Sequence, residues 1–180
     1  MTLFLIVLCL LLIAALFAGG GYVQYRRNRG RYERIASIVY DPGSWQVRFH
    51  LRTLLLKGRV GGRSVCYSVL GDSRRNEPAN SYLLLNCPVR RNFRFYAGSD
   101  PDQTDNEIRD SLARLQETPG FRGLLAVSGQ TPILARLIAR PLGFGYEPGL
   151  LLWRWTQGAF EPETVKRDYV LLVSLHEEDI

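Results

Sequence analysis

The feature that most constrains this chain is a long uncharged run at its start. No residue from Thr2 to Val23 is charged, and residues 3–18 are all apolar. At about 1.5 Å of rise per residue, about 22 residues make a helix of about 33 Å. That length matches a bilayer hydrocarbon core of about 30 Å. We therefore predict a transmembrane anchor over residues 1–24, with the lipid bilayer as a partner of the chain.

A cleaved signal peptide is the alternative for this run, because Ala18 and Gly20 are spaced like residues before a cleavage site. Two features oppose it. Met1 and Thr2 carry no basic side chain, whereas a secretory leader normally begins with positive charge, and a cluster of arginines follows the run. Positive charge beside a span tends to stay in the cytoplasm. We expect an uncleaved single-pass anchor in the plasma (inner) membrane, with the N-terminus outside and the C-terminal domain cytoplasmic. The arginines are Arg26, Arg27, Arg29, Arg31 and Arg34.

Most of the net charge of +6 comes from this arginine cluster. Beyond it the chain carries 18 basic against 16 acidic side chains, which is ordinary for a globular domain. We therefore expect no nucleic-acid partner, which would require a basic face or stripe. The cluster has two interpretations. It is either a topology signal or a membrane-surface site that binds anionic lipid headgroups.

The rest of the chain reads as one α+β domain. We predict a basic juxtamembrane segment over residues 25–44 and a globular domain over residues 45–180. Its sheet is expected to be mostly antiparallel, with about six or seven strands and two amphipathic helices, because strand-like alternation fills the first half and mixed patterns fill the second.

Four strands are predicted in the first half of the domain. Residues 47–52 alternate between apolar and polar side chains, and residues 65–69, 82–85 and 93–96 have similar patterns. The glycine-rich stretch 58–62 is expected to form a hairpin loop; it leads into a strand rather than a helix, so it does not fit a phosphate-binding loop. Short connections between the strands indicate an antiparallel meander.

The second half is predicted to mix helices with strands. Thr104 and Glu107 have the spacing of a capping box, so a helix is expected to follow and to end near Pro119. A second helix is expected over residues 131–140. The remaining strands are predicted at residues 121–127, 150–156 and 169–175.

The polar and sulfur-containing side chains do not form a known catalytic or metal-binding pattern. Cys66 and Cys87 fit no zinc spacing, and either a disulfide between them or two separately buried thiols is compatible with the sequence. The acidic residues from 100 to 107 begin like a calcium loop but lack its glycine and its last glutamate. His50 and His176 are isolated. We therefore assign no catalytic residue, cofactor or metal.

Trp153 and Trp155 are the candidate partner-binding residues, because two tryptophans on one strand face suit either a core or an exposed anchor. Core packing is the interpretation that we favour for them. The leading functional hypothesis is a non-catalytic protein-binding or scaffolding module held at the membrane, with an unidentified protein partner. A membrane-associated enzyme acting on a lipid or lipid-linked substrate is the alternative, and a lipid sensor that uses the arginine cluster is a weaker one.

Overall fold

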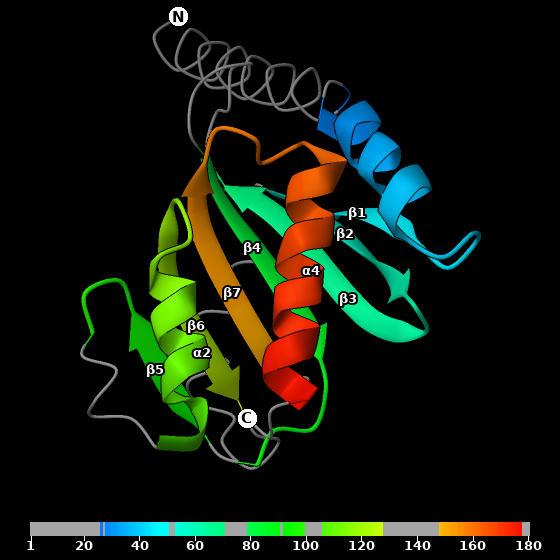
Figure 1. Ribbon diagram of the computed structural model, residues 1–180. Coiled ribbons are helices and arrows are strands. Elements are labelled where there is room, and N and C mark those ends of the chain that lie inside the picture. The colour runs from blue at the N-terminus through cyan, green and yellow to red at the C-terminus, as the bar shows by residue number, and fades with distance from the viewer. Residues whose placement is uncertain are drawn as a thin grey trace, which may run out of the picture.

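The computed structural model describes residues 26, 28–50, 53–70, 79–90, 92–99, 106–127 and 148–177. They form an α+β fold with one seven-stranded antiparallel sheet, in the order β1-β2-β3-β4-β7-β6-β5 (Figure 1). The strands are β1 (Gln46–His50), β2 (Thr53–Val60), β3 (Arg63–Leu70), β4 (Ala79–Asn86), β5 (Phe93–Tyr96), β6 (Phe121–Val127) and β7 (Gly149–Thr156).

The described helices pack on one face of this sheet, which we call the helical face. They are the helix over residues 28–39, α2 (Asn106–Gln116) and α4 (Pro162–Glu177) (Figure 1). Apolar residues of all three helices belong to one buried cluster with the odd-numbered residues of β3 and β4 and the even-numbered residues of β7. The alternation of side chains along a strand therefore places the main core on the helical face.

A second, smaller cluster lies on the opposite face of the sheet. It contains Leu55, Cys66, Leu84, Leu125 and Leu151, each at most 5% exposed. The consecutive leucines of β7 are therefore buried on both faces, which explains why this central strand reads as an unbroken apolar run.

The helix over residues 28–39 is part of the core. Tyr32, Ile35 and Ala36 are at most 1% exposed, and the Tyr32 hydroxyl accepts a hydrogen bond of 2.8 Å from the amide of Val69 in β3. The chain then turns at Asp41, whose carboxylate accepts hydrogen bonds from the amides of Gly61 and Gly62 in the β2–β3 turn. The helix over residues 28–39 and the turn that follows it are thus each attached to the sheet.

Several predictions of the fold are confirmed. The α+β class, the mostly antiparallel sheet, the expected number of strands and the helix that precedes Pro119 are all present. The predicted four-strand meander is correct only in part. β1 to β4 pair in the order of the sequence, but β2 was not predicted, and β7 and β6 lie between β4 and β5.

Two local predictions are wrong. The first is the hairpin loop over residues 58–62, where β2 continues to Val60 and the turn is Gly61–Gly62 alone. Gly58 lies inside β2, and glycine is needed there because a Cβ would come within 2.8 Å of Tyr40 and Trp45. The second is the strand over residues 169–175, which is the second half of α4.

Two helices expected from sequence cannot be compared with the structure. Among the described residues, no helix has both the length and the apolar character needed to cross a bilayer. The predicted anchor over residues 1–24 and the predicted helix over residues 131–140 lie outside the described residues.

Candidate functional site

The exposed end of β7 carries the candidate site. The strand alternation places Arg154 on the helical face and both neighbouring tryptophans on the opposite face. Trp153 is half-buried and packs on the smaller apolar cluster, whereas Trp155, one pleat further along, is 47% exposed. The favoured core-packing interpretation is therefore wrong for Trp155 and holds in part for Trp153.

Two residues from the neighbouring strands contact these indoles. Tyr96 of β5 meets the Trp153 ring edge to face, with 5.5 Å between ring centroids. Arg122 of β6 places its guanidinium 5.0 Å from the centre of the Trp155 ring, within the range of a cation–π interaction. We call Tyr96, Arg122, Trp153 and Trp155 the Trp155 patch.

Glycines of β6 and the turn before it make room for the patch. A Cβ on Gly123 would lie 2.5 Å from the Trp153 ring, so only glycine lets the indole lie against this strand. Gly120 has a φ of +75°, and a Cβ there would lie 2.0 Å from the Trp155 carbonyl oxygen. The register shift between Phe121 and Gly123 places Arg122 beside Trp155.

The arginine cluster predicted from sequence is partly described. Arg26, Arg29 and Arg34 are exposed, and Arg29 pairs with Glu33 at 2.8 Å. Arg31 places its guanidinium 5.0 Å from the centre of the Phe160 ring. Arg27 lies outside the described residues.

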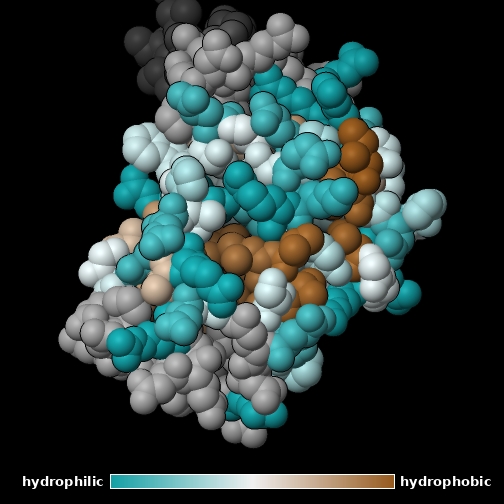
Figure 2. Space-filling view, in the orientation of Figure 1, coloured by the Kyte–Doolittle hydropathy of each residue, from teal (hydrophilic) through white to brown (hydrophobic). Residues whose placement is uncertain are grey.

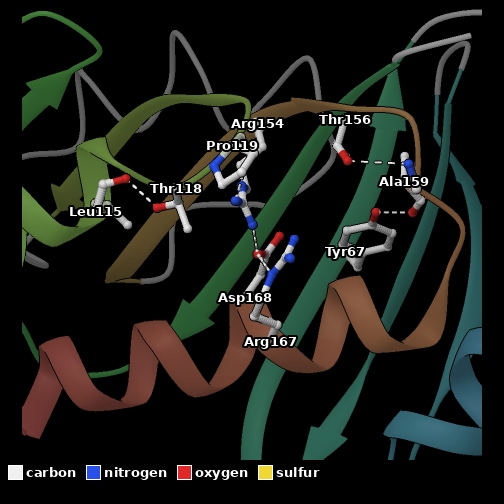
Figure 3. Close-up of polar contacts among 10 residues, drawn as sticks. Tyr67, Leu115, Thr118, Pro119, Arg154, Thr156, Ala159, Arg167 and Asp168 are labelled. Atoms are coloured by element: carbon white, nitrogen blue, oxygen red, sulfur yellow. Dashed lines mark hydrogen bonds and ion pairs between the residues drawn. The ribbon is translucent and has the colours of Figure 1, made fainter.

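A buried polar cluster lies on the helical face, behind the patch. Arg154 is 1% exposed and forms an ion pair with Asp168 of α4, which is 2% exposed (Figure 3). Its Nη2 donates to the Pro119 carbonyl oxygen at 2.9 Å. Burial raises the pKa of Asp168, and the charge of Arg154 offsets part of that rise.

Tyr67 continues this polar cluster. Its hydroxyl donates to the Ala159 carbonyl oxygen in the turn before α4 (Figure 3), and burial raises its pKa well above the usual value. Because α4 covers these groups, a substrate would have to displace the helix to reach them. Their evident effect is to hold α4 and the turn before it on the sheet.

Cys66 and Cys87 form no disulfide with each other, because they belong to the apolar clusters on opposite faces of the sheet. Burial raises the pKa of the Cys87 thiol. Within the described part of the chain, no group of three or more His, Cys, Asp or Glu side chains could hold a metal ion.

The Trp155 patch and the polar cluster are each made of residues that are distant in sequence. Tyr96 and Arg122 were missed by sequence reasoning, because only the sheet order β7-β6-β5 brings them to the tryptophans. The comparisons with known proteins add no relative: no family model, no curated protein and no solved structure matches the chain.

Proposed function

We propose that this protein is a single-pass membrane protein whose cytoplasmic domain is a non-catalytic protein-binding module, and that it binds its partner through the Trp155 patch. The observation that carries the proposal is the position of Trp155, which is 47% exposed although a tryptophan side chain is large and apolar. Tryptophan, tyrosine and arginine are the residues most enriched at the energetic centres of protein interfaces.

The patch is also held in place before any partner binds. Arg122 contacts the face of the Trp155 ring, Tyr96 contacts Trp153, and Gly123 gives Trp153 its place against β6. Side chains that are already ordered lose less conformational entropy on binding, so more of the contact energy appears as affinity. An arrangement of this kind is typical of a binding surface.

A pair of exposed variants on opposite faces of the sheet tests this proposal. Val170 is 56% exposed on the outer side of α4, where apolar residues gather across the middle of the helical face (Figure 2). The full chain with Trp155→Ala and the full chain with Val170→Ala are each expressed in native membranes, crosslinked in place, and purified for quantitative mass spectrometry.

We expect Trp155→Ala to reduce capture of at least one specific protein tenfold or more, which corresponds to about 1.4 kcal/mol. Val170→Ala is expected to leave that capture unchanged. Thermal unfolding of both variants checks that the domain remains folded. An unchanged set of partners in the folded Trp155→Ala variant, or an equal loss in both variants, would contradict the proposal.

A further inference from the structure

The charged side chains of the described strands are all basic. Among the described residues no strand carries an aspartate or a glutamate, whereas carboxylates occur in all three helices and in the turns. On the basis of the function proposed above, we infer that the partner presents an acidic peptide segment to the Trp155 patch, with its carboxylates beside Arg94 and Arg122. The distribution of charge over the two faces of the sheet leads to this inference.

On the helical face, the basic side chains of the strands pair with carboxylates of α4. Arg154 forms the buried ion pair with Asp168, and Arg63 of β3 pairs with Glu177 at 3.0 Å. The positive charge of the strands on this face is therefore balanced within the domain, by the helix that packs against it.

The opposite face of the sheet carries five basic side chains from the described strands. Residue alternation places four of them there, because their neighbours along each strand belong to the main core or pack against it. The fifth reaches this face through its contact with Trp155. The four are Arg48, Lys57, Arg59 and Arg94, and the fifth is Arg122.

Two of these five side chains lie at the Trp155 patch. Arg122 contacts the Trp155 ring, and Arg94 lies on β5 two residues before Tyr96, on the same face of the strand. Both arginines are exposed. Within the described part of the chain, no ion pair joins either of them to a carboxylate. The patch is therefore a positively charged aromatic surface.

A partner that covers the patch removes water from the guanidinium groups of Arg94 and Arg122. Desolvation of an unpaired charge costs free energy, and a carboxylate on the partner recovers it through charge-assisted hydrogen bonds. A purely apolar partner would leave both groups without that compensation. Because the patch also exposes the Trp155 and Tyr96 rings, the segment is expected to combine acidic with apolar side chains.

The basic side chains of the opposite face are too widely separated to follow a nucleic-acid backbone, which requires a continuous basic stripe. Those of β1 and β2 are separated from β6 by three strands. Neighbouring strands are about 4.8 Å apart, so β2 and β6 are about 19 Å apart. The smaller apolar cluster lies between them. A short acidic peptide needs only the two arginines beside the aromatic rings.

Selection of displayed peptides tests the charge of the partner segment. A phage library of random peptides is selected on the purified full chain in detergent and, in parallel, on its Trp155→Ala variant. Peptides that are enriched only on the unmodified chain bind through the patch. The Kd of one such peptide, and of versions with lysine or glutamine at its acidic positions, is measured by fluorescence polarisation.

Three exposed arginines are then reversed in charge, one at a time, and thermal unfolding checks that each variant is folded. Arg94→Glu and Arg122→Glu change the patch. Arg48→Glu is the matched control, because it makes the same change of charge on the same face, four strands away from β7. That separation of about 19 Å exceeds the Debye length of about 8 Å at physiological ionic strength.

We expect the Trp155-dependent peptides to carry a net negative charge. The Kd of the selected peptide is expected to rise about tenfold or more in Arg94→Glu and in Arg122→Glu, and to change less than about twofold in Arg48→Glu. The lysine version of the peptide is expected to bind Arg122→Glu more tightly than the unmodified chain, which a merely structural role of Arg122 would not produce.

Trp155-dependent peptides that are neutral or basic would overturn this inference and leave the proposed function standing. A selection that enriches no Trp155-dependent peptide would also overturn it. Tighter binding of a labelled oligothymidylate than of the peptide, lost in the same variants, would identify nucleic acid as the occupant instead. Failure of the proposed function is read separately, from an unchanged set of partners in Trp155→Ala in native membranes.

Discussion

Arg154 lies in the core although its side chain carries a guanidinium group. Its guanidinium is neutralised by Asp168 and also donates to the Pro119 carbonyl oxygen, yet its Nε has no hydrogen-bond partner among the described residues. A buried ion pair with an unsatisfied donor recovers only part of the free energy lost on desolvation. The ion pair therefore contributes more to the position of α4 on β7 than to the stability of the fold.

A double-mutant cycle tests this interpretation. Asp168→Leu or Arg154→Met alone leaves one charge buried without its partner, so each is expected to lower the free energy of unfolding by about 3–5 kcal/mol. The double variant Arg154→Met with Asp168→Leu removes both charges and is expected to lose far less than the sum. Urea unfolding of the full chain in detergent gives the three values. If the loss of unfolding free energy in the double variant equalled the sum of the two single losses, the two side chains would act independently.

The pH dependence of stability provides a second test of the same pair. Burial raises the folded-state pKa of Asp168 above its ordinary value of 3.8, so the folded protein holds this proton more tightly than the unfolded chain. The stabilising contribution of Asp168 to the free energy of unfolding is therefore fully present below about pH 4. It declines as pH rises through the folded-state pKa of Asp168.

We expect the free energy of unfolding of the wild type, minus that of Asp168→Asn, to fall as pH rises from 3.5 to 7. The asparagine variant is the control because it keeps the size of the side chain and removes the titrating proton. A difference that grows with pH would mean that pairing with Arg154 outweighs burial.

At the scale of elements, α4 shows what could not be read from the sequence. Its buried residues Val165, Leu172 and Leu175 have helical spacing, but Asp168 falls on the same buried face and interrupts the apolar stripe. The following aromatic and β-branched residues then resemble a strand. Pro162 at the first helical position was the available signal for a helix.

The candidate site was predictable to a similar degree. The strand that carries Trp153 and Trp155 and their shared face follow from residue alternation. Alternation does not show which face of this strand belongs to the core. The residue between the two tryptophans is Arg154, and its partner Asp168 lies in a helix that the sequence pattern did not reveal. The contacts with Tyr96 and Arg122 depend on sheet order, which short-range patterns do not determine.

The fit of Trp153 against β6 leads to a prediction about Gly123. In Gly123→Ala the new methyl group would lie 2.5 Å from the indole, so the ring must move. We expect a loss of about 1–3 kcal/mol in the free energy of unfolding and a changed near-ultraviolet circular dichroism signal. In a Trp153→Leu background the same substitution is expected to cost much less. Equal costs in the two backgrounds would show that the glycine has another role.

At the scale of the whole molecule, the helix over residues 28–39 follows the predicted anchor in the sequence and belongs to the folded domain. Its core contacts through Tyr32, Ile35 and Ala36 and the capture of the β2–β3 turn by Asp41 make it part of the folded unit. The position of this helix relative to the sheet, and so to the Trp155 patch, is therefore set by the core of the domain.

The side of the membrane on which the domain lies is the last prediction. Five arginines directly after the uncharged run favour a cytoplasmic domain. Val170→Cys places a thiol on the exposed surface of α4, away from the Trp155 patch, while the native Cys66 and Cys87 are buried. A membrane-impermeant maleimide is expected to label this variant only after cells are permeabilised, and the unmodified chain gives the background. Labelling in intact cells would reverse the orientation. The Trp155 patch would then have to find its partner outside the cell.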